Sequence, residues 1–168
     1  MSQPQISLFT WMLEDVRKET LEGVKHLTKE QLMQSPIENE YPIGTYLMHL
    51  AETDIDWLED LSGIEQPEVL KKKCFYMKWF ARLKTSELPS EMVEIEDYLS
   101  VMSEARKNFL DFVLAMYDEQ LEEFVFDRRS GKTIQWQKKW IIYHLLEHEA
   151  HHRGQMFMLI RKAGLNKK

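Results

Sequence analysis

The stretch His144-Leu-Leu-Glu-His148-Glu-Ala-His151-His152-Arg-Gly-Gln155 carries four of the six histidines of this 168-residue chain. Apolar residues at three- and four-residue spacing run through it and predict one continuous helix from Ile134 to Lys162, ended by Gly164. Each helical residue turns by about 100°, so His144, His148 and His152 climb one face in steps of about 40°. Two imidazoles one turn apart can hold the same divalent metal ion. The stretch therefore predicts a metal site and leaves open the source of a further ligand.

A helical wheel ranks these histidines by how closely they face the core. The centre of the apolar arc falls between Leu145 and Met156. His152 lies about 30° from this centre and His148 about 70°, whereas His144 and His151 lie about 110° and 130° away. We therefore expect His148 and His152 to face the core side and His151 to face water.

Length and composition bound the class of protein. A chain of 168 residues can bury a substantial core, and we expect residues 1–168 to form one domain. The net charge of −6 argues against a nucleic-acid partner, which would need a basic surface. The single cysteine, Cys74, suits a reducing compartment. The N-terminal residues lack the pattern of a signal peptide, and no apolar run approaches the roughly 18 residues of a membrane span. We expect a cytoplasmic protein with no membrane partner.

The remaining pattern predicts an all-α fold. Amphipathic spacing predicts long helices over residues 6–27, over 43–61 with Gly63 after the end, and from about Ser90 to Tyr117. Thr28 to Gln31 has the form of a capping box and predicts a short helix through Met33. Residues 64–88 predict a long connection with a short helix, and residues 124–133 a small extended excursion. Four long helices with a long crossover between the second and third predict a four-helix bundle.

A bundle builds metal sites in its core from side chains on facing helices. Outside the cluster the chain has His26, at the tail of the first helix, and His49, at the border of the apolar arc of the second. Taken alone, His49 is more typical of a histidine at the edge of an apolar face that is hydrogen-bonded to a neighbour than of a metal ligand. Within one bundle, however, His49 and the His148/His152 pair support one another. A site of three imidazoles leaves coordination positions for water or substrate, as reactive metal sites do.

The motif from His148 to Gln155, with a histidine in the second helix, resembles the DinB-like family. The resemblance covers essentially the whole chain in length and helix order. It implies a four-helix bundle, often homodimeric, that binds a divalent metal through three histidines. Carried over to the matching positions, the ligands are His49, His148 and His152. Histidine is also frequent in relatives at the position of His144, for which we expect a supporting role beside the ligands.

The same resemblance implies two classes of activity. The superfamily includes bacillithiol transferases and the mycothiol-dependent maleylpyruvate isomerase, in which the metal is thought to activate a low-molecular-weight thiol. The chain would then transfer a thiol to a small-molecule electrophile, or carry out metal-assisted hydrolysis. Imidazole ligands do not distinguish Zn, Ni, Mn and Fe. The alternatives are a non-catalytic metal-binding or stress-related dimer, and a helical scaffold whose histidines form no site.

A few other polar residues are candidates for supporting roles. Thr53 and Asp56 lie within two turns of His49 and could orient a ligand or a bound water, although such residues are more often merely solvated. Glu149 falls inside the apolar arc of the last helix and Arg153 at its edge, so we expect each to make a contact between helices or at an interface. The run Lys71–Lys73 is expected to form a solvated face.

Overall fold

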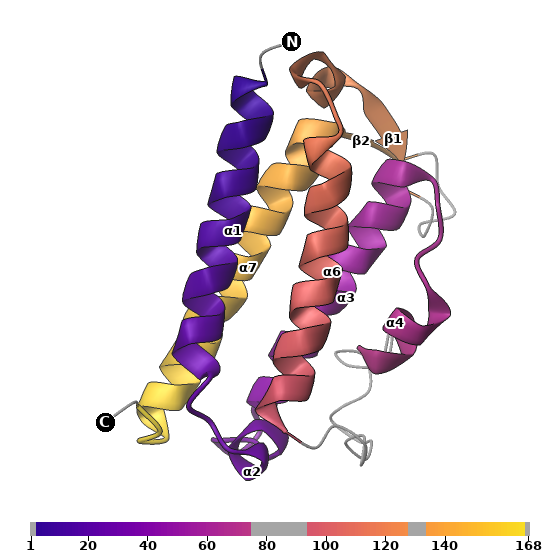
Figure 1. Ribbon diagram of the computed structural model, residues 1–168. Coiled ribbons are helices and arrows are strands. Elements are labelled where there is room, and N and C mark those ends of the chain that lie inside the picture. The colour runs from indigo at the N-terminus through magenta and orange to yellow at the C-terminus, as the bar shows by residue number, and fades with distance from the viewer. Residues whose placement is uncertain (1–2, 75–93, 128–133, 167–168) are drawn as a thin grey trace.

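The computed structural model describes residues 3–74, 94–127 and 134–166, and these are mostly helical. In chain order the elements are the helices α1 (Pro4–Val24), α2 (Lys29–Met33), α3 (Ile43–Ser62), α4 (Glu68–Lys73) and α6 (Ile95–Leu114), the 3₁₀ helix η1 (Asp118–Glu122), the strands β1 (Phe124–Phe126) and β2 (Gln135–Gln137), and the helix α7 (Lys138–Lys162). The four long helices α1, α3, α6 and α7 lie side by side as a bundle (Figure 1). The predicted all-α four-helix bundle is confirmed.

The helices α3 and α6 run in the same direction, and α1 and α7 run in the opposite one (Figure 1). The chain therefore has to return along the bundle between α3 and α6. The short helix α4 lies in this connection, as expected for residues 64–88, and Cys74 at its end is buried. Residues 75–93 of the expected crossover lie outside the described residues. Within the described residues, no helix is long and apolar enough to cross a membrane.

Several predicted helix ends are confirmed by their capping groups. In α2 the Thr28 hydroxyl accepts a hydrogen bond from the Gln31 amide, and the Gln31 side chain accepts one from the Thr28 amide at 2.8 Å. Gly63 follows α3 with φ of 69°, the left-handed conformation that glycine adopts without steric cost. Gly164 follows α7 in the same way, with φ of 70°.

The start of the last helix was predicted wrongly. Residues 135–137 form β2, which pairs antiparallel with β1 and places Val125 opposite Trp136, so α7 begins at Lys138 instead of Ile134. The alternation around Val125 confirms the described part of the expected excursion, whose residues 128–133 lie outside the described residues. The third long helix also ends earlier than predicted, at Leu114, because Tyr117 already caps η1 with Gln120.

The core consists of two apolar clusters separated by a layer of charge. The α2-end cluster includes Val24, Leu47, Leu50, Val101, Met102, Met156 and Leu159. The hairpin-end cluster includes Leu13, Leu58, Leu61, Phe109, Val113, Ile141 and Leu145. Between them lies a buried network of ion pairs with one member from each long helix, namely Arg17, Asp54, Arg106 and Glu149, which we call the charged layer. The three histidines predicted as ligands come from the two helices that contribute Asp54 and Glu149.

Candidate metal centre

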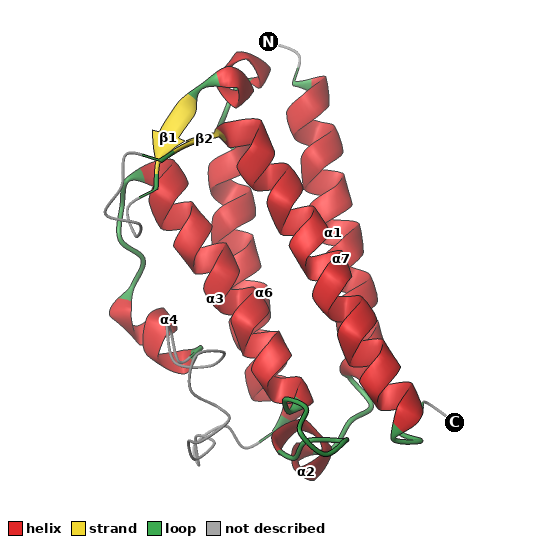
Figure 2. Ribbon diagram, turned by 180° about the vertical axis from the view of Figure 1, so that it is seen from behind, coloured by secondary structure: helices red, strands yellow, loops and turns green. Residues whose placement is uncertain are grey.

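Three histidines from two neighbouring helices of the bundle meet in one place. α3 contributes His49 and α7 contributes His148 and His152, and the two helices face each other in the view of Figure 2. The Nε2 atom of His148 lies 3.1 Å from the Nε2 of His49 and 3.1 Å from the Nε2 of His152. One ring nitrogen from each of the three residues lies within 4.8 Å of the other two. The structure thus brings together the histidines that the sequence singled out.

The outer ring nitrogens of two of these histidines fix which nitrogen faces the site. His152 donates from Nδ1 to the side-chain oxygen of Gln155 at 2.6 Å, so in the neutral ring Nε2 carries a lone pair. The Nδ1 of His49 lies 3.4 Å from a carboxylate oxygen of Glu52, which can only accept a hydrogen. Both Nε2 lone pairs therefore point at His148. Such outer partners are typical of histidines that bind metals.

Burial and neighbouring imidazoles keep His148 and His152 of α7 neutral. Burial, together with the nearby rings of His152 and His49, lowers the pKa of His148 to about 3. Burial also lowers the pKa of His152 to about 4, although its hydrogen bond to Gln155 acts in the opposite direction. At neutral pH both rings are consequently in the unprotonated form in which histidine binds a metal.

A cation fits this arrangement better than hydrogen bonds do. A neutral imidazole carries one hydrogen on its two nitrogens, so at most one of the two 3.1 Å approaches to His148 can involve a hydrogen on its own Nε2. The buried Nδ1 of His148 has no hydrogen-bond partner among the described residues, whichever ring nitrogen carries the hydrogen. Imidazole nitrogens about 2.0–2.1 Å from a tetrahedral ion lie roughly 3.3 Å apart, close to the spacing seen here. The donor set therefore suits a divalent ion.

The other three histidines lie outside this group. His151 is exposed, as the wheel predicts. His26 is bonded through Nε2 to the Leu165 carbonyl, 2.7 Å away. His144 stacks on Trp140 with ring centroids 4.9 Å apart and planes 5° apart, and its centroid is 5.5 Å from that of His148. His144 thus lies beside the site but is not one of the three histidines whose ring nitrogens meet. Its supporting role stays a prediction.

The two candidates near His49 are both buried, unlike most residues of their type. The Thr53 hydroxyl donates to the backbone carbonyl of His49 at 2.7 Å, so its hydrogen is engaged by the helix backbone and is not donated to the His49 ring. Asp56 is buried one turn further along α3. Lys71, expected to be solvated, instead forms an ion pair with Glu59 that leaves its side chain 12% exposed. Lys72 and Lys73 are exposed as expected.

Glu149 and Arg153 make the contacts between helices that their wheel positions predict. Glu149 accepts hydrogen bonds from Arg17 at 2.8 Å and from Arg106 at 2.7 Å. Arg153 reaches the Val16 carbonyl of α1 at 3.3 Å. The two arginines were not recognised from the sequence. Their position in the apolar arcs of α1 and α6 was the available indication, because a charge placed there has to find a buried partner.

The fold and the site together define a helical bundle with a three-histidine group shared by two of its helices. The profile of the DinB family matches residues 1–168, and the chain therefore belongs to the DinB family. A search of curated proteins finds no match.

Solved structures of similar fold come from bacteria. YfiT from Bacillus subtilis, described as a probable metal-dependent hydrolase with an unusual four-helix bundle topology, superposes with a TM-score of 0.68 at 16% identity, covering 98% of this chain and 90% of that one. A DinB-like protein from Bacillus cereus ATCC 10987 gives a TM-score of 0.68 at 18% identity, with coverage of 93% and 91%. A conserved protein from Enterococcus faecalis gives 0.66 at 14%, with coverage of 96% and 97%. At such identities these structures support the fold alone.

Proposed function

We propose that this protein is a divalent-metal-dependent enzyme in which His49, His148 and His152 hold one ion. The observation that carries the proposal is the convergence of three Nε2 atoms, two pairs of them 3.1 Å apart. Three protein ligands leave at least one coordination position for water or substrate, as in catalytic and unlike structural zinc sites. The reaction that this arrangement supports best is metal-assisted hydrolysis of a small molecule. The description of YfiT as a probable metal-dependent hydrolase agrees with it.

The residues of the chain prepare the site for a bound ion in two ways. A bound divalent ion supplies Lewis acidity, which lowers the pKa of a coordinated water or thiol by several units. Gln155 and Glu52 hold the rings of His152 and His49 through their Nδ1 atoms. Burial keeps His148 and His152 unprotonated, so that protons do not compete with the ion near neutral pH.

Metal binding is tested first. Protein purified without a histidine tag should retain about one equivalent of zinc, nickel, manganese or iron per chain, as a single shared site requires. His49→Ala, His148→Ala and His152→Ala should each release this metal. His151→Ala is the matched control, because His151 is an exposed histidine of the same helix and should leave the metal content unchanged. Equal metal content in all four variants would contradict the proposed ligands.

The reaction is tested next, with the metal-loaded protein. Hydrolysis of ester and amide substrates should depend on the three ligand histidines and not on His151. The family resemblance also supports transfer of a thiol, which is measured with bacillithiol as donor and monochlorobimane as electrophile. Activity in the second assay alone would favour the transferase. Inactivity in both, with metal bound, would favour the non-catalytic alternative.

We also infer that the chain acts as a cytoplasmic homodimer, on the basis of the family resemblance. Two large apolar side chains of α1 support self-association, since Leu8 and Trp11 are 51% and 59% exposed. Sedimentation equilibrium should give twice the chain mass, and Trp11→Ser should shift the protein toward the monomer. A monomeric wild-type protein at micromolar concentration would contradict this inference.

A further inference from the structure

Helix α7 carries more candidate ligands than the site uses. His144, His148 and His152 follow one another at intervals of one turn. If α7 moved along its axis by one turn, His144 and His148 would take the places of His148 and His152, and two histidines would still face His49. The histidine spacing alone therefore does not decide which pair meets His49. Some other feature of the core has to fix the axial position of α7.

The charged layer lies next to the three histidines along the bundle axis. Glu149 follows His148 directly, and Asp54 lies five residues after His49 on α3. Arg17 bonds Glu149 through Nε and Asp54 through Nη2, both at 2.8 Å. Arg106 bonds Asp54 in bidentate fashion at 2.9 and 3.0 Å and Glu149 at 2.7 Å. Each carboxylate is thus shared by both arginines, and the four side chains are between 0% and 5% exposed.

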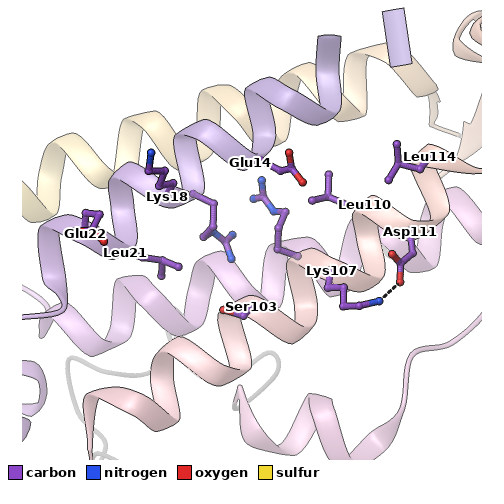
Figure 3. A pocket seen from close by; sticks show the side chains of 11 residues that line it. Glu14, Lys18, Leu21, Glu22, Ser103, Lys107, Leu110, Asp111 and Leu114 are labelled. Atoms are coloured by element: carbon purple, nitrogen blue, oxygen red, sulfur yellow. Dashed lines mark hydrogen bonds and ion pairs between the residues drawn. The ribbon is translucent and has the colours of Figure 1, made fainter. Parts of the chain in front are cut away.

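The two arginines also link the helices that hold them. Arg17 of α1 donates to the Met102 carbonyl of α6 at 2.7 Å, and Arg106 of α6 donates to the Leu13 carbonyl of α1 at 3.0 Å. These bonds lie beside an open groove of about 430 Å³ between α1 and α6, lined by Arg17 and Arg106 and by the charged and apolar side chains labelled in Figure 3. Beside this groove, directional polar contacts connect the two helices.

We propose that the charged layer selects His148 and His152, rather than His144 and His148, as the pair that faces His49. Apolar contacts above and below the layer are non-directional and tolerate alternative registers better than charge pairs do. A one-turn shift of α7 would place Leu145 where Glu149 lies, and both arginines would lose a shared carboxylate inside the core. The layer therefore allows one register, and Asp54 and Glu149 act as positioning residues for the ligands. The inference rests on the proposed metal site.

The test asks how strongly zinc binding depends on His144 and on His152, in protein with and without the charged layer. The layer variant carries Arg17→Met, Asp54→Leu, Arg106→Met and Glu149→Leu, which replaces the charges by apolar side chains. Dissociation constants for zinc are measured for His144→Ala and His152→Ala in both backgrounds. With the layer intact, His152→Ala should weaken zinc binding by more than the roughly 100-fold upper range for outer-shell partners, and His144→Ala by at most about 10-fold, the lower end of that range. In the layer variant, His144→Ala should weaken zinc binding by more than about 10-fold, and the effect of His152→Ala should shrink.

Two further measurements keep the result interpretable. If the layer variant loses its helical circular dichroism, the smaller variant Asp54→Leu with Arg106→Met replaces it, since it removes one charge of each sign. In metal-free protein, nuclear Overhauser effects from the His49 ring should reach His148 and His152 with the layer intact, and should also reach His144 in the folded layer variant. The proposal would be overturned if, in a folded layer variant, zinc binding still required His152 to the same extent and the His49 ring kept the same contacts. Wild-type protein without zinc affinity would overturn the proposed function, and the ring contacts would then decide the present inference alone.

Discussion

At the scale of single residues, the candidate site contains two imidazoles, those of His148 and His152, that stay neutral at pH values at which ordinary histidines begin to bind protons. The pKa of His148 falls to about 3 and that of His152 to about 4, mainly because both rings are buried. Their unfolded-state pKa is near the ordinary value of 6.5. Between about pH 6.5 and 4 the unfolded chain therefore binds more protons than the metal-free folded protein. In this window the free energy of unfolding has to decrease as the pH falls.

We accordingly predict a pH-dependent stability for the metal-free protein. The free energy of unfolding should decrease from pH 7 to pH 5.5. Each of the two histidines should contribute at most about 1.4 kcal/mol per pH unit to this decrease. Urea denaturation of EDTA-treated protein at several pH values measures this slope. His148→Gln with His152→Gln should flatten it, because glutamine does not titrate. The same slope in this double variant would show that other groups are responsible.

The residues of the site differ in how far the sequence could predict them. His148 and His152 were recognisable because helical periodicity places them beside an apolar arc. His49 was recognisable because it lies at the border of the apolar arc of a second long helix, whereas His26 lies at a helix tail. The arginines of the charged layer were not recognised, because periodicity indicates that a position is buried but not which distant residue it meets. Asp54 was passed over for the same reason. Pairings between four helices depend on rotations and heights that no single stretch of sequence specifies.

At the scale of elements, the start of α1 depends on a residue far along the chain. The N-cap residue Gln3 provides no side-chain hydrogen bond to the first turn. Instead the carboxylate of Asp118, in η1, accepts hydrogen bonds from the amides of Gln5 and Ile6, each at 3.0 Å. The negative charge also suits the positive end of the helix dipole. Asp118 therefore caps α1 and ties it to η1.

We predict that Asp118→Ala lowers the free energy of unfolding by about 1 kcal/mol, the usual cost of losing an N-cap. Urea denaturation measures this change, and hydrogen exchange should increase at the first turn of α1. Glu119→Ala provides the matched control, because Glu119 is an exposed acidic neighbour in the same 3₁₀ helix. Equal losses in the two variants would point to η1 itself and not to the cap.

The elements themselves were predictable where the local sequence chemistry is strong. The capping box of α2 and the glycines after α3 and α7 were found where the sequence predicts them. The prediction failed for residues 135–137, where apolar spacing is compatible with a helix but β1 offers a partner strand. A strand pairing is a contact across the chain, so the periodicity of Trp136 and its neighbours alone could not reveal it.

At the scale of the whole molecule, the charged layer makes the four long helices depend on one another. Burial alone would raise the pKa of Glu149, but the positive charges of Arg17 and Arg106 outweigh it and lower this pKa to about 2. The carboxylates of Glu149 and Asp54 likewise raise the pKa of the Arg17 guanidinium, although burial opposes them. The layer pairs two arginines with two carboxylates, so its formal charges sum to zero. Removing one member unbalances the other three, each on a different helix.

This balance predicts a large difference between a single and a paired substitution. Arg17→Met should lower the free energy of unfolding by about 3–5 kcal/mol, because two buried carboxylates are left with one arginine. Arg17→Met combined with Glu149→Leu keeps the layer neutral, since Arg106 and Asp54 retain their bidentate pair. The double variant should therefore be more stable than Arg17→Met alone, and urea denaturation with the full double-mutant cycle measures the coupling. Additive losses would mean that each residue contributes separately, and that the four helices are not linked through their charges.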